Sequence, residues 1–384
     1  MNDKKLYPND YLPTPCFLID ENRVIHNLEI LKGVSERTGC KILLAQKAFS
    51  MYSIYPLLGK YLDGTTASGL YEARLGHTYF GKETHVYSPA FREDEFEEVL
   101  NYADCIVFNT PDQVSKYGKE AKKAGKSIGL RINPECSTQV NQDIYNPCAP
   151  GSRLGTTFSR FEEGILPLLD GLHFHTLCQQ NSDALAATVQ AVEEKFGKYL
   201  PRMKWLNLGG GHHITRSDYD VSLLERTVQH LQETYQLQVY LEPGEAVVLN
   251  AGYLVSRVLE IMENGMQIAI LDTSAACHMP DVLEMPYRPP LQKSKKPGED
   301  SESFPYTYRL AGPTCLAGDV IGDYSFAKPL QEGDELVFED MALYTMVKTN
   351  TFNGMPLPAI LWRNVAGEIT IVREFGYNDF ESRL

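Results

Sequence analysis

The sequence of 384 residues has the composition of an ordinary globular protein, with 43% hydrophobic and 22% charged residues, and a formal net charge of −14. This excess of acids argues against a nucleic-acid-binding surface, which needs clustered Lys and Arg. It is compatible with a cationic substrate, although the need for solubility explains an acidic surface equally well. No run approaches the roughly 20 apolar residues of a membrane span, so no membrane association is expected.

The cysteines and the first residues of the chain indicate the cellular compartment of the protein. The eight cysteines are scattered singly, and no pair has the C-x-x-C spacing of a zinc or redox site. Residues 1–13 are polar and proline-containing, without the apolar core of a signal peptide. We therefore expect reduced thiols and a cytoplasmic location. The length fits two domains better than one.

The first part of the chain alternates short apolar runs with amphipathic helical stretches. Eight runs have the character of strands, at residues 41–47, 64–68, 85–88, 105–109, 127–133, 171–176, 205–209 and 239–242. Helical periodicity is clearest at residues 95–102, 113–124, 184–196 and 222–235. This alternation predicts a (β/α)8 TIM barrel over residues 21–250. An open doubly wound sheet is the alternative, but no G-x-G-x-x-G follows the first strand.

After residue 250 the pattern changes to short strands joined by turns rich in Pro and Gly. The strand candidates are residues 255–262, 267–271, 306–310, 334–338 and 368–374. They predict an antiparallel β-sandwich or β-barrel domain over residues 251–384. Residues 14–20 are a further strand candidate, so residues 1–20 are assigned to the same domain. The proline-rich residues 286–305 are predicted to form a mobile surface loop.

Residues that could take part in catalysis or binding stand at the ends of the predicted barrel strands, where the βα loops build active sites. Lys47 follows an apolar strand, and burial there would favour the neutral amine that Schiff-base formation requires. An exposed lysine closing a strand is equally compatible. The glycine triplet 209–211 lets the backbone approach a phosphate, or forms only a tight turn. Glu242 would hold a pyridine nitrogen protonated, or form a structural salt bridge.

His173 and His175 form an H-x-H pair on one predicted strand, so both side chains face the same side. Two histidines are typical metal ligands in hydrolase barrels. One of them would instead stack on a cofactor ring while the other is structural, and His212 and His213 leave the choice open. No carboxylate stands at a matching spacing, so no metal is expected.

Taken in order, the motifs resemble the fold-type III pyridoxal-phosphate decarboxylases, which include ornithine, diaminopimelate and carboxynorspermidine decarboxylases. The implied fold is that of alanine racemase, a barrel with a β domain. The motifs are A-Q-K-A at 45–48, A-S-G at 67–69, R-I-N-P at 131–134, H-F-H at 173–175, L-G-G-G at 208–211, E-P-G at 242–244, G-P-T-C at 312–315 with Asp319, and T-F-N-G at 351–354 with Tyr344. Each motif alone is weak, but the ordered set covers nearly the whole chain.

The resemblance implies a role for each matching barrel residue. Pyridoxal 5'-phosphate would be held as a Schiff base on Lys47, with His175 stacked on its pyridine ring. Glu242 would pair with the ring nitrogen. The amides of Gly210 and Gly211, together with the Tyr344 hydroxyl, would hold the phosphate.

The resemblance also implies a homodimer with shared active sites. Cys315 would come from the partner subunit of a head-to-tail dimer and return a proton to the substrate carbon. Asp319, close to it in sequence, would face the substrate amine.

The substrate expected from the resemblance is a polyamine-like amino acid. Residues 272–289, with 175–178, resemble the branch of the family that converts carboxynorspermidine or carboxyspermidine to norspermidine or spermidine. Glu245 stands where ornithine decarboxylases have an arginine that touches the phosphate. With Asp281 and Glu284 it would bind substrate amines, unless these acids form ordinary salt bridges.

Three other functions remain as alternatives. An amino-acid racemase of this fold would have a tyrosine where Cys315 stands. A diaminopimelate decarboxylase would need basic residues for the second carboxylate of its substrate, and Glu245 opposes that. A non-catalytic pyridoxal-phosphate carrier protein resembles the barrel alone, so the predicted β domain opposes that function.

Overall fold

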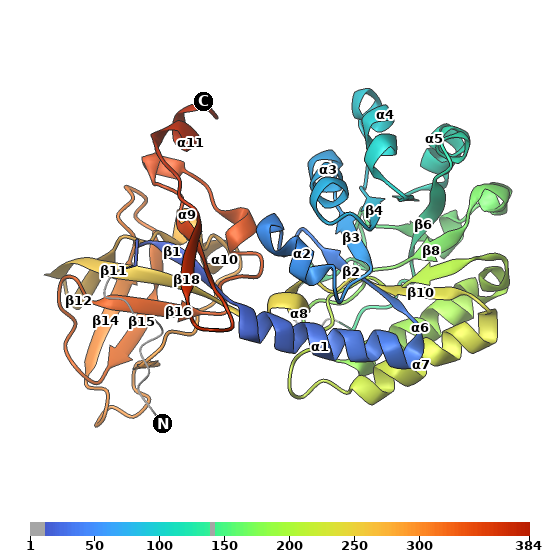
Figure 1. Ribbon diagram of the computed structural model, residues 1–384. Helices are drawn as coiled ribbons and strands as arrows, with labels where there is room; N and C mark the ends of the chain where they lie inside the picture. The colour runs from blue at the N-terminus through green and yellow to red at the C-terminus, as the bar shows by residue number, and fades with distance from the viewer. Residues whose placement is uncertain (1–11, 139–142) are drawn as a thin grey trace. The chain divides into compact units, whose positions relative to one another are not determined.

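The computed structural model describes residues 12–138 and 143–384, and the chain divides into two compact units. The barrel unit is His26–Val247, and the β unit combines Met1–Ile25 with Val248–Leu384. Of the N-terminal segment assigned to the β domain, residues 1–11 lie outside the described part. Each unit has its own sheet (Figure 1).

The barrel unit contains a closed parallel sheet, as predicted. Its strands pair in the order β5-β4-β3-β2-β10-β9-β8-β6, and the β5–β6 pairing closes the ring. The short β7 (Thr156–Thr157) pairs with the end of β6. The barrel strands are β2 (Lys41–Ala45), β3 (Gly64–Ala67), β4 (Glu83–Tyr87), β5 (Cys105–Phe108), β6 (Ser127–Asn133), β8 (Gly171–His173), β9 (Trp205–Asn207) and β10 (Gln238–Leu241). Several end one to three residues earlier than predicted, because the chain leaves the sheet there and turns into the loop that leads to the next helix.

Amphipathic helices surround this sheet (Figure 1). The four helices predicted from periodicity are present as α4 to α7. In α5, Pro111 occupies the first turn and the Thr110 hydroxyl accepts a bond from the Gln113 amide, so the sequence caps its own helix. The helices of this part are α1 (Glu21–Thr38), α2 (Tyr55–Leu58), α3 (Leu70–Tyr79), α4 (Glu93–Tyr102), α5 (Pro111–Lys123), α6 (Ser182–Phe196), α7 (Val221–Tyr235) and α8 (Glu245–Val248).

Short 3-10 turns complete the connections. The segment between β6 and β8 contains, in its described part, only such turns and the two-residue β7, with no α-helix, so the βα alternation is interrupted there. The turns of the whole chain are η1 (Tyr52–Ile54), η2 (Asp143–Tyr145), η3 (Phe158–Arg160), η4 (Glu163–Leu168), η5 (Gly197–Arg202), η6 (Met346–Lys348) and η7 (Phe352–Gly354).

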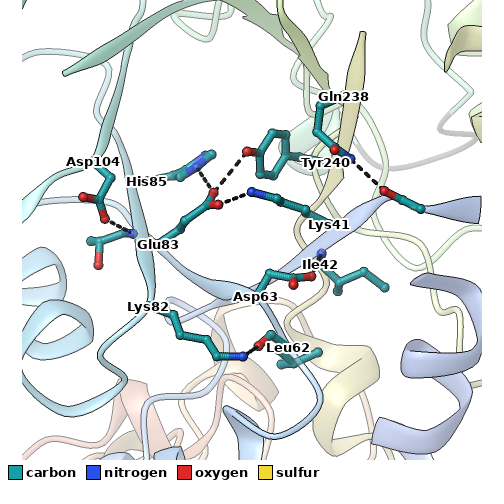
Figure 2. A network of polar contacts seen from close by, with 12 residues as sticks. Lys41, Ile42, Leu62, Asp63, Lys82, Glu83, His85, Asp104, Gln238 and Tyr240 are labelled. Carbon is teal, nitrogen blue, oxygen red and sulfur yellow. Dashed lines mark hydrogen bonds and ion pairs between the residues drawn. The ribbon is translucent and has the colours of Figure 1, made fainter. Parts of the chain in front are cut away.

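A polar network closes the barrel at the strand starts (Figure 2). The Glu83 carboxylate pairs with Lys41, accepts a bond from the Tyr240 hydroxyl at 3.0 Å and lies 3.3 Å from Nε2 of His85. Burial alone would raise the pKa of Glu83, but His85 and Lys41 outweigh it and lower the pKa to about 2. Burial works against a charged His85, but Cys105 and Glu83 raise its pKa to about 10.

Trp205 fills the barrel interior beside this network. Its indole N–H donates to the Ser127 hydroxyl at 2.9 Å. A Cβ atom on Gly129 or Gly171 would come within 2.3 Å of the Trp205 ring, so only glycine leaves room for it. The starts of β6, β8 and β9 are therefore packed around one indole.

The β unit has a mostly antiparallel sheet, as predicted, in which two of the strand pairs are parallel. Its path is β13-β15-β14-β12-β11-β1-β17-β18, with β16 paired to β11. β1 runs parallel to β17, and β12 runs parallel to β14. The strands are β1 (Cys16–Asp20), β11 (Gly252–Glu263), β12 (Gln267–Leu271), β13 (Ser294–Lys295), β14 (Tyr306–Ala311), β15 (Val320–Phe326), β16 (Glu335–Glu339), β17 (Ala359–Arg363) and β18 (Ile369–Arg373).

Short helices and one anchored loop accompany this sheet. The helices are α9 (Ala275–His278), α10 (Asp281–Glu284) and α11 (Tyr377–Glu381). The segment predicted as a loop at residues 286–305 is tied to the sheet, because β13 pairs with β15 and Leu291 bridges Phe338. Across the described residues, no helix is both long and apolar enough to cross a membrane.

Candidate active site

Lys47 lies in the turn that follows β2, two residues after the strand ends. Its side chain keeps contact with solvent, yet protein atoms crowd its amine. Burial, and after it the Arg131 guanidinium, lower the pKa of Lys47, although Glu242 and Glu245 act in the other direction. The position therefore favours the neutral amine that a Schiff-base lysine needs.

Gln46, which the sequence did not single out, fixes the turn that carries Lys47. The fully buried amide of Gln46 accepts a bond from the Tyr55 hydroxyl at 3.0 Å and donates to the Glu72 carbonyl at 2.8 Å. Because both ends of this amide are engaged, the backbone next to Lys47 is held in place.

Glu242 follows β10 directly, and its carboxylate is held by two barrel side chains. Asn207 donates to Oε1 at 2.7 Å, and Nε2 of His173 lies 3.5 Å from Oε2. Burial alone would raise the pKa of Glu242, but His173 and Asn207 outweigh it and lower the pKa to about 2. Glu242 is therefore an ionised carboxylate that is largely removed from solvent, with 13% of its side chain exposed, which is costly unless it has a function or a partner.

His175 follows β8 and presents a neutral ring. The Gly210 amide donates to Nδ1 of His175 at 2.9 Å, which fixes Nδ1 as the unprotonated nitrogen. Burial first, and then Lys47 and Arg131, hold the pKa of His175 well below its usual range. A Cβ on Gly210 would come within 2.1 Å of the Glu242 carbonyl oxygen, so only glycine permits this approach.

This bond corrects one prediction for the glycine triplet. The Gly210 amide is committed to His175 and is not directed at an anion. Gly211, in a left-handed conformation with φ of 81°, remains the candidate amide for a phosphate. Within the triplet, the Gly210 amide thus orients the ring of His175, and the Gly211 amide is the one that the prediction of a phosphate contact still concerns.

Glu245 begins α8, and both of its carboxylate oxygens are engaged. Oε2 pairs with His213, and Oε1 accepts a bond from the Gln179 amide at 3.1 Å. The carboxylate is buried. The salt-bridge alternative therefore describes Glu245 better than a carboxylate free to bind a substrate amine.

Arg131 is a further cation of this site to which the sequence gave no role. Its guanidinium donates to the His175 carbonyl at 3.0 Å and lies 4.6 Å from the centre of the Tyr87 ring. The Tyr87 hydroxyl donates to Asn109 at 2.8 Å. This stack fixes the loop that carries His175. The R-I-N-P motif at 131–134 was the signal that pointed here.

The β unit carries the other predicted residues. Cys315 is exposed, and its amide donates to the Asn353 side chain at 2.7 Å. Asp319 is only 3% exposed and accepts bonds from the Thr314 hydroxyl at 2.7 Å and the Ala276 amide at 3.2 Å. Asp319 therefore braces the loop of Cys315, and its burial does not support the predicted contact with a substrate amine.

The acids of α10 are also paired. Asp281 and Glu284 both form ion pairs with Lys348, as the salt-bridge alternative anticipated. Asp281 is thus not a free carboxylate for a substrate amine. Tyr344, half-buried with φ of 54°, belongs to the same unit.

The structure brings together Lys47, His175, Gly210, Gly211 and Glu242 around the ends of the barrel strands, where a barrel enzyme has its active site. In residues 12–138 and 143–384, no group of three or more His, Cys, Asp and Glu side chains is arranged to hold a metal ion.

Comparison with known proteins identifies the family. Residues 16–342 match the family described as "Pyridoxal-dependent decarboxylase, C-terminal sheet domain". The chain belongs to the pyridoxal-dependent decarboxylases. Its cofactor is pyridoxal phosphate, and the residues fit that group: a crowded amine at Lys47, a neutral ring at His175, a glycine amide at Gly211 and an ionised carboxylate at Glu242.

Relatives with named activities cover almost the whole chain. A carboxynorspermidine/carboxyspermidine decarboxylase of Campylobacter jejuni is 44% identical over 97% of this chain and 98% of its own length. A carboxyaminopropylagmatine decarboxylase of Synechocystis is 41% identical over 97% of this chain and 96% of its own. The crystal structure of the Campylobacter jejuni carboxynorspermidine decarboxylase with norspermidine superposes with a TM-score of 0.91 at 42% identity, covering 97% of this chain and 100% of that one.

Proposed function

We propose that this decarboxylase converts carboxynorspermidine or carboxyspermidine to norspermidine or spermidine. The observation that carries the proposal is the 44% identity to the Campylobacter jejuni enzyme, which extends over 97% of this chain and so includes both units. A net charge of −14 suits a substrate with several ammonium groups.

The barrel residues have definite parts in this reaction. Pyridoxal phosphate, when bound, supplies the ring that accepts the electrons left by departing CO₂. Lys47 offers the amine that holds it, and Glu242, ionised by its neighbours, keeps a proton on the pyridine nitrogen. His175 provides a neutral flat surface for the ring. The Gly211 amide and the Tyr344 hydroxyl are assigned to the phosphate.

A homodimer with shared sites is part of the proposal. The partner's Cys315 would return the proton to the substrate carbon after CO₂ leaves. In support, Cys315 is exposed. Within the same chain its amide bonds the Asn353 side chain, and apolar side chains close in sequence to Cys315 or Asn353 are exposed as well: Leu316 at 43%, Val347 at 37% and Phe352 at 45%. Such exposed apolar groups are typical of an interface. We also propose a cytoplasmic location, which the eight unpaired cysteines of the described chain favour.

A complementation experiment tests the shared site. In this proposal the Lys47→Ala dimer and the Cys315→Ala dimer are each inactive alone. After equal amounts are mixed and subunits exchange, half of the dimers contain one chain of each variant. Each of these mixed dimers has one site with both wild-type residues. About a quarter of the wild-type activity should return. If exchange is confirmed by mass and no activity returns, each site takes both residues from one chain and the shared-site proposal is wrong.

A second candidate substrate is carboxyaminopropylagmatine, favoured by the 41% identity to the Synechocystis enzyme. It differs in ending with a guanidino group. The discriminating experiment supplies carboxynorspermidine, carboxyspermidine, carboxyaminopropylagmatine, diaminopimelate and ornithine separately and measures CO₂ release as kcat/KM. We expect the first two to exceed diaminopimelate and ornithine by about 100-fold or more, because the identity is 44% to the carboxynorspermidine/carboxyspermidine decarboxylase but only 25% to a diaminopimelate decarboxylase of Oryza sativa. A higher value for carboxyaminopropylagmatine would transfer the assignment to it, and a higher value for diaminopimelate would refute both.

A further inference from the structure

His173 is the member of the H-x-H motif that the proposed function leaves without a part. It ends β8 and is only 2% exposed. Within the described residues, neither ring nitrogen makes a well-formed hydrogen bond, and the nearest carboxylate oxygen is Oε2 of Glu242 at 3.5 Å from Nε2. Burying an imidazole with both nitrogens unsatisfied costs free energy, so this position needs a reason.

Asn207, at the end of the neighbouring strand β9, holds the other oxygen of the same carboxylate. Its side-chain Nδ2 donates to Oε1 of Glu242 at 2.7 Å, while its side-chain Oδ1 accepts a bond from the Gly209 backbone amide at 2.9 Å. Because Gly209 can only donate, the orientation of the Asn207 amide is fixed, with its NH₂ group directed at Glu242.

We propose that His173 and Asn207 are positioning residues that hold the Glu242 carboxylate ionised and oriented toward the cofactor ring. This inference rests on the proposed role of Glu242. Two neighbours on the adjacent strands β8 and β9 meet the two oxygens of one carboxylate. The ring of His173 is itself packed against Tyr87, with centroids 5.7 Å apart, so its position does not depend on Glu242 alone.

A comparison within the barrel argues against His173 as a mere core residue. At the strand starts, Glu83 also contacts a histidine, but Lys41 supplies a full positive charge to that carboxylate. No lysine or arginine forms an ion pair with Glu242 in the described part of the chain. The Glu242 carboxylate, with 13% of its side chain exposed against 32% for Glu83, therefore depends on His173 and Asn207 for its charge in a way that Glu83 does not.

The experiment compares the holoenzymes of His173→Phe, His173→Gln, Asn207→Leu and Glu242→Gln with the wild type. Tyr240→Phe is the matched control, because it removes a hydrogen bond made from β10, the strand that precedes Glu242, but to Glu83 in the network at the strand starts and not to Glu242 (Figure 2). Three quantities are measured for each: kcat and KM separately, the dissociation constant of pyridoxal phosphate, and the visible absorbance of the bound cofactor as a function of pH.

We expect His173→Phe and Asn207→Leu to lower kcat about 10- to 100-fold with little change in KM, because each removes a polar group that contacts the Glu242 carboxylate. The absorbance change that reports the ring proton should move to lower pH in both. His173→Gln keeps a donor and should recover most of kcat and of the pH profile. Tyr240→Phe should match the wild type in all three quantities.

The outcomes distinguish the positioning role of His173 and Asn207 from the role of Glu242 itself. Wild-type kcat and pH profiles in Asn207→Leu and in both His173 variants would overturn the inference while Glu242→Gln still shows the loss. Wild-type behaviour of Glu242→Gln itself would overturn the proposed role of Glu242. If His173→Phe does not fold, His173→Gln and Asn207→Leu decide the question, because an unchanged Asn207→Leu enzyme contradicts the inference by itself.

Discussion

At the strand starts of the barrel His85 lies 3.3 Å from Glu83, and at the strand ends His173 lies 3.5 Å from Glu242. The first pair is completed by Lys41 and the Tyr240 hydroxyl, so every charge in it has a partner. The second pair lies in the same region as the low-pKa amine of Lys47 and the neutral ring of His175.

The difference shows how one scaffold divides its tasks between its two ends. Charges at the strand starts neutralise one another and contribute to stability. Groups at the strand ends are left with unusual pKa values and with hydrogen-bonding capacity that a cofactor can use. Substitutions should therefore separate cleanly, with those at the strand ends changing activity and those at the strand starts changing the free energy of unfolding.

The largest effect is expected for Lys47→Ala at the strand ends. Loss of the amine should lower kcat about 1,000-fold or more and remove the visible absorbance of the bound cofactor. The free energy of unfolding should change by less than about 0.5 kcal/mol, because the amine makes no stabilising ion pair. CO₂ release and chemical denaturation measure the two quantities. A variant that kept the absorbance would show that another residue holds the cofactor.

At the strand starts, Glu83→Gln should destabilise the barrel by about 3 kcal/mol, because it leaves the buried His85 without its counter-charge. The folded pKa of Glu83, about 2, lies below its ordinary value. Its contribution is therefore present above about pH 4.5 and is lost as the pH falls toward 2. Denaturant midpoints followed by Trp205 fluorescence in a Trp362→Phe background measure this for the barrel unit alone. A gap between wild type and variant that is as large at pH 3 as at pH 7 would contradict the ion-pair explanation.

His85→Gln should show the opposite pH dependence, with a loss of about 2 kcal/mol at pH 6. The folded pKa of His85, about 10, lies above its ordinary value near 6.5. Its stabilising contribution is complete below about pH 6.5 and disappears as the pH rises toward 10, so wild type and variant should converge there. The same fluorescence measurement at pH 6, 8 and 10 is sufficient. Curves that stay parallel would mean that His85 is uncharged.

The smallest effect belongs to Tyr240→Phe. This change removes one hydroxyl bond at 3.0 Å from Glu83, which keeps its other partners. We expect a loss of about 1 kcal/mol in unfolding free energy and no change in kcat. A fall in kcat would show that the strand starts are coupled to the active site and would weaken the division between the two ends.

Much of this architecture is readable from the sequence. The eight strands and the residues at their ends follow from periodicity, because each βα unit repeats the same apolar pattern. In the β unit β15 and β17 were missed, and in β15 Gly322 and Asp323 interrupt the alternation. β13, with two residues, carries no periodic signal at all.

The partner of each site residue in the fold was harder to predict from the sequence. Asp281 and Glu245 look alike in the sequence as free acids, but Lys348 and His213, distant in the chain, neutralise them in the fold. The same holds for the Gly210 amide, whose partner His175 comes from another loop. Motifs locate residues at strand ends, whereas long-range pairing decides which of their groups remain available.

The position of β1 has a consequence for how the protein is made. This strand lies between β11 and β17, so both of its neighbours are synthesised after the whole barrel. The barrel residues 26–247 are contiguous and can fold as they emerge from the ribosome. The apolar segment Cys-Phe-Leu-Ile-Asp at 16–20 has no partner strand until residues 252–255 of β11 have been added, and it lacks its second partner until residues 359–363 follow. Nascent chains should therefore be most prone to aggregation in this interval, and deleting residues 16–20 would remove an interior strand of the β unit.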